Sequence, residues 1–254
     1  MDKQKPLFIA FSTQKGGAGK SVFTTLAASY LHYQRDYNIL VIDCDEGQYS
    51  LHRMRERDME IVQNEISWEV KFAVQLQTTK KNAYTILCAP PEQAISIAEN
   101  YLSNSDQKID IVLFDLPGTV NSRGVMECVQ HLDYIFTPIT SDKIVLESSL
   151  AFAIAIRDLL IINPDSQLKG LYLYWNMVDA REKTELYEIY GDIIEDLGLT
   201  LLQTQIPDRK RYKKELSKDG REVFRCTLFP PHPKLLKGSR FDELVDEVLQ
   251  IMNQ

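Results

Sequence analysis

One short segment limits the choice of fold more than any other part of this sequence. The apolar run Leu7–Ser12 leads into the glycine-rich residues Gln14–Ser21 (QKGGAGKS), and these open the helical pattern Gly19–Tyr33. Glycine lets backbone N–H groups approach an anion, and the N-terminus of a helix is the positive end of its dipole. The segment therefore predicts an α/β fold that binds a phosphorylated ligand at the end of its first strand.

The rest of the chain alternates short apolar runs with helical patterns. Strands are predicted at Leu7–Ser12, Ile39–Asp43, Tyr84–Cys88, Ile109–Asp115, Tyr134–Pro138, Leu171–Trp175 and Leu201–Ile206. Helices are predicted at Gly19–Tyr33, Pro91–Leu102, Lys143–Ile162, Arg181–Leu197 and Phe241–Met252. Strands that are apolar throughout are typical of a sheet covered on both faces. We therefore predict an α/β fold, with a mostly parallel, twisted β-sheet flanked by helices on both faces.

Two stretches give no clear helical or strand pattern. Residues 47–77 are charged and ambiguous, whereas Arg221–Gly238 contains several prolines and is predicted to be a loop. A chain of 254 residues that is 44% hydrophobic can bury one large sheet, and it contains no linker or internal repeat. We expect a single domain over residues 1–254.

Cysteine spacing and hydropathy favour a cytoplasmic protein. The scattered Cys44, Cys88, Cys128 and Cys226 form no CxxC pair, which favours reduced thiols over disulfides or a zinc site. No segment reaches the roughly 18 apolar residues of a membrane span. The N-terminal residues lead directly into a predicted strand rather than into a signal sequence.

The charge of the chain is unevenly distributed. The net charge is −7, yet residues 205–240 contain eleven basic and four acidic side chains, so this segment is about +7 and the rest about −14. Such asymmetry indicates an anion-binding face on an acidic body, and the alternative is an ordinary solvated surface. The candidate DNA-binding residues are Arg209, Lys210, Arg211, Lys213, Lys214, Lys218 and Arg221.

The glycine-rich segment supplies the groups that a nucleoside triphosphate requires. Lys20 can reach the β and γ oxygens, and the Ser21 hydroxyl can bind Mg²⁺. Gln14 replaces the first glycine of the ordinary GxxxxGK[ST] pattern, so the match is to KGGxGK[ST] with an additional Lys15. A chance glycine-rich turn is the alternative. The candidate nucleotide-binding residues here are Lys15, Gly16, Gly17, Ala18, Gly19, Lys20, Ser21 and Val22.

Carboxylates follow two of the predicted strands. Asp43 and Asp45 stand at the end of one strand, and Asp115, followed by Leu116-Pro117-Gly118, ends another. Ligands of open α/β sheets bind at the carboxyl ends of strands, where such carboxylates can hold a metal or an attacking water. Taken singly, an aspartate at a strand end is more often a helix cap or turn residue.

The loop, the additional lysine and these carboxylates resemble the ParA/MinD family of deviant Walker-A ATPases over most of the chain. The resemblance implies a P-loop NTPase fold, ATP or ADP with Mg²⁺, and hydrolysis of ATP. The family's additional lysine, here Lys15, reaches the partner subunit's ATP, so ATP binding produces a homodimer, and Lys15, Lys20 and Asp45 are the expected catalytic residues. The family normally has Thr at Ser21 and a hydroxyl residue at Val22, but Ser21 keeps the metal-binding oxygen and Val22 its N–H.

The resemblance also assigns roles to the carboxylates. Asp43 helps to hold the Mg²⁺ shell, Asp45 orients the attacking water, and Gly118 senses the γ-phosphate through its backbone N–H. The metal-binding residues implied are Ser21, Asp43 and Asp115. After Asp45 the sequence Glu46-Gly47-Gln48 departs from the family's DxDPQ form and is closer to relatives on conjugative transposons, which leaves the turnover rate open.

The family reads the base with an asparagine and a proline-containing loop. These correspond to Asn176 and to Pro207-Asp208, each after a late predicted strand. An asparagine offers a donor and an acceptor to the adenine edge. An ordinary asparagine in a turn is the alternative.

Several functions are compatible with these residues. The first is a ParA-type switch whose ATP dimer binds non-specific DNA at the nucleoid, with a ParB-like partner stimulating hydrolysis, in DNA partition or the maintenance or transfer of a mobile element. The alternative is a MinD-like or cargo-positioning ATPase that acts through a protein or membrane partner. Because the helix Phe241–Met252 is acidic, we expect no membrane binding. An iron–sulfur protein of this scaffold is disfavoured, since Cys128 has no partner cysteine in a suitable loop.

Overall fold

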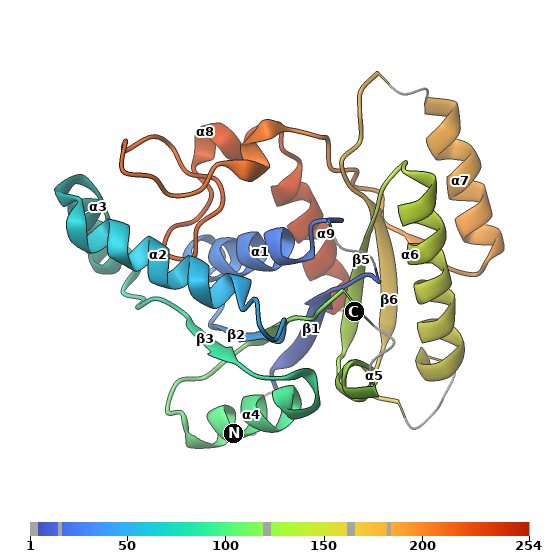
Figure 1. The fold of residues 1–254 in the computed structure, drawn as a ribbon, viewed down its shortest axis with the longest axis horizontal. Coiled ribbons are helices and arrows are strands. Elements are labelled where there is room, and N and C mark those ends of the chain that lie inside the picture. Colours follow the sequence, from blue (N-terminus) through green and yellow to red (C-terminus); the bar gives the residue numbers. More distant parts are fainter. Residues whose placement is uncertain (1–4, 15–16, 119–122, 162–165, 182–183, 254) are drawn as a thin grey trace.

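A single parallel sheet forms the centre of the computed structural model, which describes residues 5–14, 17–118, 123–161, 166–181 and 184–253. Its strand order is β3-β2-β4-β1-β5-β6-β7, and every pair is parallel (Figure 1). The strands are β1 (Leu7–Phe11), β2 (Ile39–Asp43), β3 (Thr85–Cys88), β4 (Ile111–Asp115), β5 (Tyr134–Ile139), β6 (Gly170–Trp175) and β7 (Thr200–Leu201). The predicted fold class is confirmed.

Helices cover both faces of this sheet. One face is covered by α1 (Lys20–Gln34) and α9 (Phe241–Met252), whose apolar residues pack with Phe11 and Tyr174. The other face is covered by α4 (Pro91–Asn104), α5 (Arg123–Val129), α6 (Lys143–Ile156) with the π-helical turn Arg157–Ile161, and α7 (Thr184–Asp196). Because both faces are buried, the central strands carry almost no polar side chains.

The helix α9 has the bounds that its periodicity predicts. Its Phe241, Leu244, Val245 and Val248 are buried in the cluster that contains α1. The acidic residues Asp246 and Glu243 remain on its outer side, where they pair with Arg35 and Arg240. The apolar stripe of this helix therefore packs in the core and is not available to a membrane.

The ambiguous residues 47–77 contribute to a pair of helices, α2 (Ser50–Asn64) and α3 (Ile66–Thr79). This pair packs on the segment 214–229 through a separate apolar cluster that includes Trp68 and Phe229. The Trp68 indole N–H donates to the Ser217 carbonyl oxygen at 2.9 Å. The helix pair therefore connects the end of β2 with the basic segment of the chain.

Polar contacts buried between α2 and the C-terminal segment strengthen this connection. The Asp58 carboxylate, 1% exposed, accepts hydrogen bonds from the Thr227 N–H and hydroxyl, both at 2.8 Å. The Arg55 guanidinium donates to the Thr227 hydroxyl and carbonyl oxygens at 3.0 Å and to the Tyr84 carbonyl oxygen at 2.8 Å. Each polar group thus has a partner, as burial requires.

Two predictions for the C-terminal part of the chain need correction. The last strand ends at Leu201 instead of Ile206, because the N–H groups of Gln203 and Thr204 donate to the Glu247 carboxylate of α9 instead of a strand. The predicted loop at 221–238 contains a single helical turn, α8 (Pro233–Leu236), whose N-terminus is capped by the His232 imidazole.

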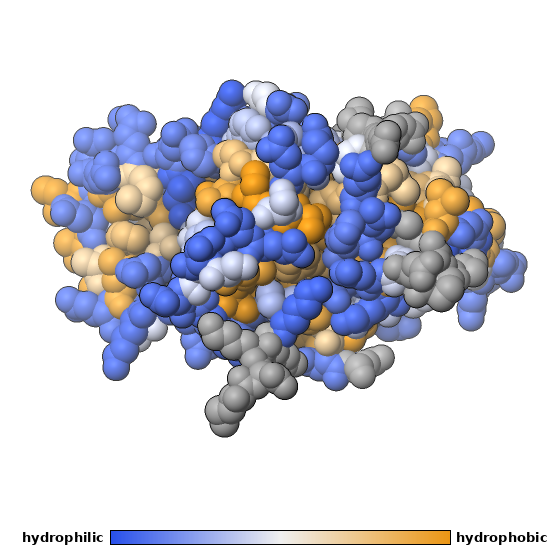
Figure 2. Space-filling view, turned by 90° about the horizontal axis from the view of Figure 1, so that it is seen from below, coloured by the Kyte–Doolittle hydropathy of each residue, from blue (hydrophilic) through white to orange (hydrophobic). Residues whose placement is uncertain are grey.

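Apolar side chains are exposed in several places, including the middle of the face in Figure 2, and two groups of them lie near opposite ends of the molecule. Figure 2 shows them at the end of the molecule that carries α3 and on the side of α6 and α7. On α3 the exposed residues are Ile66, Val70 and Val74, and on α7 they are Leu186, Ile189 and Ile193.

Candidate functional site

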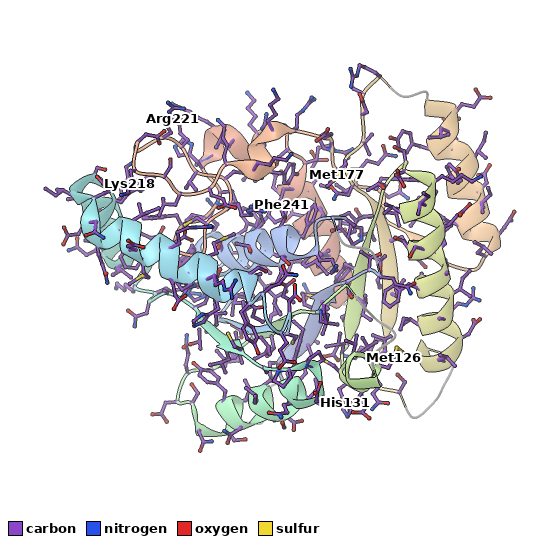
Figure 3. All side chains as sticks on the ribbon, in the orientation of Figure 1. Met126, His131, Met177, Lys218, Arg221 and Phe241 are labelled. Atoms are coloured by element: carbon purple, nitrogen blue, oxygen red, sulfur yellow. The ribbon has the colours of Figure 1, made fainter. Side chains whose placement is uncertain are left out.

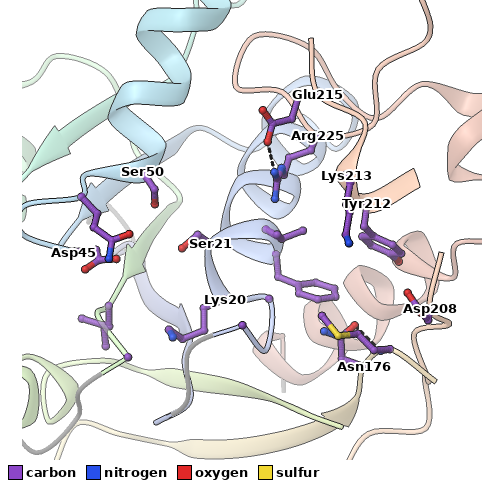
Figure 4. A pocket seen from close by; sticks show the side chains of 18 of the residues that line it. Lys20, Ser21, Asp45, Ser50, Asn176, Asp208, Tyr212, Lys213, Glu215 and Arg225 are labelled. Carbon is purple, nitrogen blue, oxygen red and sulfur yellow. Dashed lines mark hydrogen bonds and ion pairs between the residues drawn. The ribbon is translucent and has the colours of Figure 1, made fainter. Parts of the chain in front are cut away.

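A large pocket lies at the carboxyl ends of the central strands, where ligands of open α/β sheets bind. Its volume is about 970 Å³. The structure brings the following predicted residues to its walls: Gly17, Gly19, Lys20, Ser21, Val22, Asp45, Gly118, Asn176, Pro207 and Asp208. Figure 4 shows Lys20 and Ser21 between Asp45 on one side and Asn176 on the other. Residues from five separate segments of the chain therefore meet in one cavity.

The described part of the glycine-rich loop has the backbone geometry that only glycine adopts readily. Gly17 and Gly19 have φ values of 83° and 97°, in the left-handed region. A Cβ atom on Gly19 would also lie 3.0 Å from the Asn176 amide nitrogen. Lys15 and Gly16, which the sequence places at the nucleotide, lie outside the described residues.

Lys20 is buried at the start of α1. Burial lowers the pKa of its ammonium, while the Asp115 and Asp45 carboxylates act in the opposite direction. A buried cation is stable only with negative charge beside it. Asp115 and Asp45 supply part of that charge, and a bound polyphosphate would add to it.

Asp115 is fully buried at the end of β4. The Thr24 hydroxyl donates to its Oδ1 at 3.3 Å, and its Oδ2 has no hydrogen-bond partner among the described residues. Burial raises the pKa of this carboxyl to about 7, against the opposing effects of the Ser21 hydroxyl and the Lys20 ammonium. An unpartnered buried oxygen beside a hydroxyl is a suitable place for Mg²⁺ or a water bound to it.

Asp43 has a structural partner that its sequence position does not reveal. Its Oδ2 accepts hydrogen bonds from the Leu51 and His52 N–H groups, at 3.0 and 3.1 Å, and so caps the N-terminus of α2. Burial raises the pKa of this carboxyl, and these backbone N–H groups oppose the rise. Asp43 does not line the pocket, whereas Asp45 does. Asp43 therefore links the site to α2.

Metal ligands in this site are few. Among the residues that the structure describes, no group of three or more histidine, cysteine, aspartate or glutamate side chains could hold a metal ion. Mg²⁺ is normally held by one or two protein oxygens, with phosphates and waters completing its shell. Ser21 and Asp115 are sufficient for that arrangement, with Asp43 close enough to influence the Asp115 charge.

The two segments predicted to bind the base lie side by side. Val178 pairs with Pro207 in a short parallel bridge, and the Asp208 N–H donates to the Val178 carbonyl oxygen at 2.9 Å. Asn176 is only 4% exposed, and its amide nitrogen donates to the Ala18 carbonyl oxygen at 2.8 Å. Asn176 therefore braces the glycine-rich loop in addition to lining the pocket.

The basic segment divides into inward and outward parts. A 3₁₀ turn, η2 (Lys210–Lys213), places Arg209 and Lys213 in the pocket wall. The Arg211 guanidinium donates to the Leu235 and Lys237 carbonyl oxygens and so anchors α8. Lys210, Lys214, Lys218 and Arg221 do not line the pocket, and all four are exposed, as are Arg209 and Lys213.

The sequence did not identify several residues of the pocket. Phe23 and Tyr212 form an aromatic wall, with ring centroids 6.0 Å apart. Glu215 and Arg225 enter the wall as an ion pair. Phe23 stands next to the motif and could have been suspected, but the other three are brought in only by the tertiary fold.

Comparison with protein families gives a match over most of the chain. Residues 9–222 match CbiA, the CobQ/CobB/MinD/ParA nucleotide binding domain. This chain belongs to that family. The membership accounts for the pocket, since a parallel sheet with a deviant Walker-A loop is the P-loop NTPase fold of the ParA/MinD group.

Solved structures of low sequence identity share this fold. A putative plasmid partition protein from Borrelia burgdorferi B31 bound to AMPPNP has 19% identity and a TM-score of 0.61, over 97% of this chain and 99% of that one. The pNOB8 ParA has 18% identity and a TM-score of 0.61, over 98% and 99%. A chain of the MinC:MinD cell division protein complex from Aquifex aeolicus has 13% identity and a TM-score of 0.58, over 98% and 96%.

Curated proteins give no significant match by sequence. At these identities the structural likeness establishes the fold alone. Any more specific activity must therefore be argued from the residues of this chain.

Proposed function

We propose that this protein is an ATP-dependent dimerising switch of the ParA type, acting as a single domain and hydrolysing ATP to ADP and phosphate with Mg²⁺. The observation that carries the proposal is the meeting of three parts in one pocket: the glycine-rich loop, the carboxylate Asp45, and the base loops at Asn176 and Asp208. The buried Asp115 lies behind the pocket wall and interacts with Ser21 and Lys20. A structural neighbour bound to AMPPNP and another bound to ADP and magnesium support the choice of ligand.

Each residue has a physically reasonable part in this reaction. Lys20 and the N-terminus of α1 hold the phosphates, and Mg²⁺ bound near Ser21 and Asp115 offsets the charge on the transferred phosphoryl group. Asp45, half-buried in the pocket wall, orients the attacking water. Gly118 presents a backbone N–H toward the γ-phosphate. The water oxygen forms a bond to phosphorus as the bond to ADP breaks.

Dimerisation follows from the second lysine. Lys15 is expected to reach the phosphates of the partner's ATP, so that the nucleotide joins two subunits. A cation placed against developing phosphate charge stabilises the transition state, which couples dimer formation to hydrolysis. A ParB-like partner would then set the rate of hydrolysis.

Non-specific DNA is the output that the charge distribution favours. Lys210, Lys214, Lys218 and Arg221 are exposed, and Figure 3 shows Lys218 and Arg221 on the loop near the end of α3. Flexible cations bind DNA phosphates without reading sequence. Two such surfaces joined by ATP bind much more tightly than one. The proposed role is therefore DNA partition or mobile-element maintenance or transfer, at the nucleoid.

A second candidate is a cargo-positioning or MinD-like switch that acts through a protein partner. The observation that favours it is the exposed apolar row Leu186, Ile189 and Ile193 on α7, which is flanked by acidic residues. Such a row on a soluble surface is typical of a protein contact. Within the described residues, no helix has the length and apolar character to cross a membrane.

The test is binding of non-specific duplex DNA, with and without ATP and Mg²⁺, over a range of salt concentrations. The ParA-type proposal predicts binding that requires ATP and falls steeply with salt. Lys20→Ala is the control, because this variant should lose only the component of DNA binding that depends on ATP. ATP-dependent dimerisation without DNA binding would support the protein-partner candidate instead.

A further inference from the structure

Two cations of the C-terminal segment face the nucleotide pocket, although neither belongs to the glycine-rich loop or the base loops. Lys213 at the end of η2 and Arg225, twelve positions later, both line the cavity. Figure 4 shows the Lys213 ammonium and the Arg225 guanidinium pointing into the pocket from the side opposite Lys20 and Ser21. A phosphorylated ligand bound at Ser21 would therefore have positive charge on both sides.

An ion-pair network at the edge of the pocket holds Arg225 in this orientation. Its Nη2 donates to the Glu215 carboxylate, whose other oxygen accepts from the Arg57 Nη2 of α2 at 2.6 Å. The Arg225 Nε is buried and has no hydrogen-bond partner among the described residues. One carboxylate between two guanidinium groups leaves a net positive charge at the pocket wall.

The position of these cations along the pocket indicates which part of a nucleotide they meet. Asp45 lies on one side of the cavity, where the γ-phosphate is expected, and Asn176 and Asp208 lie on the other side, where the base is expected (Figure 4). Figure 4 shows Arg225 between these two sides, and Lys213 beside Tyr212 on the side of Asn176 and Asp208. The part of a nucleotide between its γ-phosphate and its base is the α-phosphate and ribose.

We propose that Lys213 and Arg225 form a second phosphate-binding wall that holds the α-phosphate and ribose of the bound nucleotide. This inference rests on the proposed function and deepens it. It also separates the basic segment into two roles, since Lys213 then serves the nucleotide while the exposed Lys214 remains available to DNA. The reach of a flexible ammonium suits an α-phosphate that the glycine-rich loop contacts only from one side.

The test is the Kd of ADP and of ATP, each with Mg²⁺, for wild type, Lys213→Ala and Lys213→Arg. A hydrogen bond to a charged group is worth about 1.5–3 kcal/mol, so Lys213→Ala should raise the Kd of both nucleotides about tenfold or more. The loss should be equal for ADP and ATP, because both carry the α-phosphate. Lys213→Arg should restore most of the affinity. Lys213 is exposed enough for these variants to fold.

Lys237→Ala is the matched control. Lys237 is exposed at the end of α8 and does not line the pocket, so its loss should leave both Kd values unchanged. An unchanged Kd for Lys213→Ala, or a loss confined to ATP, would overturn the inference. Failure of the wild type to bind either nucleotide would instead contradict the proposed function, so the two failures are distinguishable.

Discussion

The buried carboxyl of Asp115 should make the nucleotide-free protein lose stability as pH rises. Burial raises its pKa from 3.8 to about 7, so the folded chain keeps this proton up to neutral pH while the unfolded chain releases it near pH 4. Between these values the unfolded state binds fewer protons, and the free energy of unfolding therefore falls as pH rises. The stabilising effect is complete below about pH 4 and is lost through pH 7.

The size of the effect follows from the two pKa values. Each tenfold change in proton affinity corresponds to about 1.4 kcal/mol, so the full contribution is about 4 kcal/mol, of which roughly 2.5 kcal/mol falls between pH 5 and pH 8. Asp115→Asn keeps the shape and the acceptor for Thr24 but cannot ionise. Relative to wild type, this variant should gain roughly 2.5 kcal/mol in unfolding free energy across that range.

Urea unfolding of both proteins at pH 5, 6, 7 and 8 measures this difference. Comparing the two proteins cancels the contributions of the other titrating groups. If the free energies of unfolding of wild type and Asp115→Asn changed with pH in parallel, burial would not hold Asp115 protonated. Binding of ATP with Mg²⁺ should also release this proton. At pH 6.5 we expect wild type to release more than half a proton from Asp115, and Asp115→Asn to release none from this position. Calorimetry in two buffers with different heats of ionisation measures the number of protons released.

Three further predictions concern other parts of the protein. Lys20→Ala should abolish ATP binding, whereas Lys15→Ala should leave ATP bound but impair dimerisation or hydrolysis, and equal loss of binding in both variants would contradict the role of Lys15. Asp45→Ala should accumulate an ATP-bound dimer, because phosphate contacts remain while the water loses its orientation, so normal phosphate release would place that role elsewhere. Thr227→Val should lower the unfolding free energy by about 1–3 kcal/mol, because Asp58 and Arg55 each lose a hydrogen bond to the Thr227 hydroxyl. Thr78→Val, on the exposed side of α3, is the control and should have little effect in the same urea assay.

The sheet and the phosphate site could be predicted because local sequence determines them. A strand buried on both faces is a continuous apolar run wherever it occurs, and the observed strands match these runs to within a few residues except at β7. The glycine-rich loop needs left-handed backbone at Gly17 and Gly19, a demand visible in the residue types themselves. The catalytic role of Asp45 and the metal-binding role of Asp115 remain predictions, and Asp45→Ala tests the first of them.

The helix pair α2 and α3 could not be predicted because it does not bury an ordinary apolar stripe. Its buried positions include the charged Asp58, while Ile66 and Val70 are exposed. Charged side chains satisfied by distant backbone groups, as Asp58 is by Thr227, leave no periodic signal. The inward direction of Arg225 has the same origin, since it depends on an ion pair with Glu215.

Dimerisation by ATP is the central claim, and the mass of the protein in solution tests it most directly. Asp45→Ala, which should not turn over nucleotide, would be examined by sedimentation with ADP and Mg²⁺ and with ATP and Mg²⁺. We predict the monomer mass of 29.3 kDa with ADP and twice that mass with ATP. A monomer in both states, at nucleotide concentrations that saturate the site, would contradict the account.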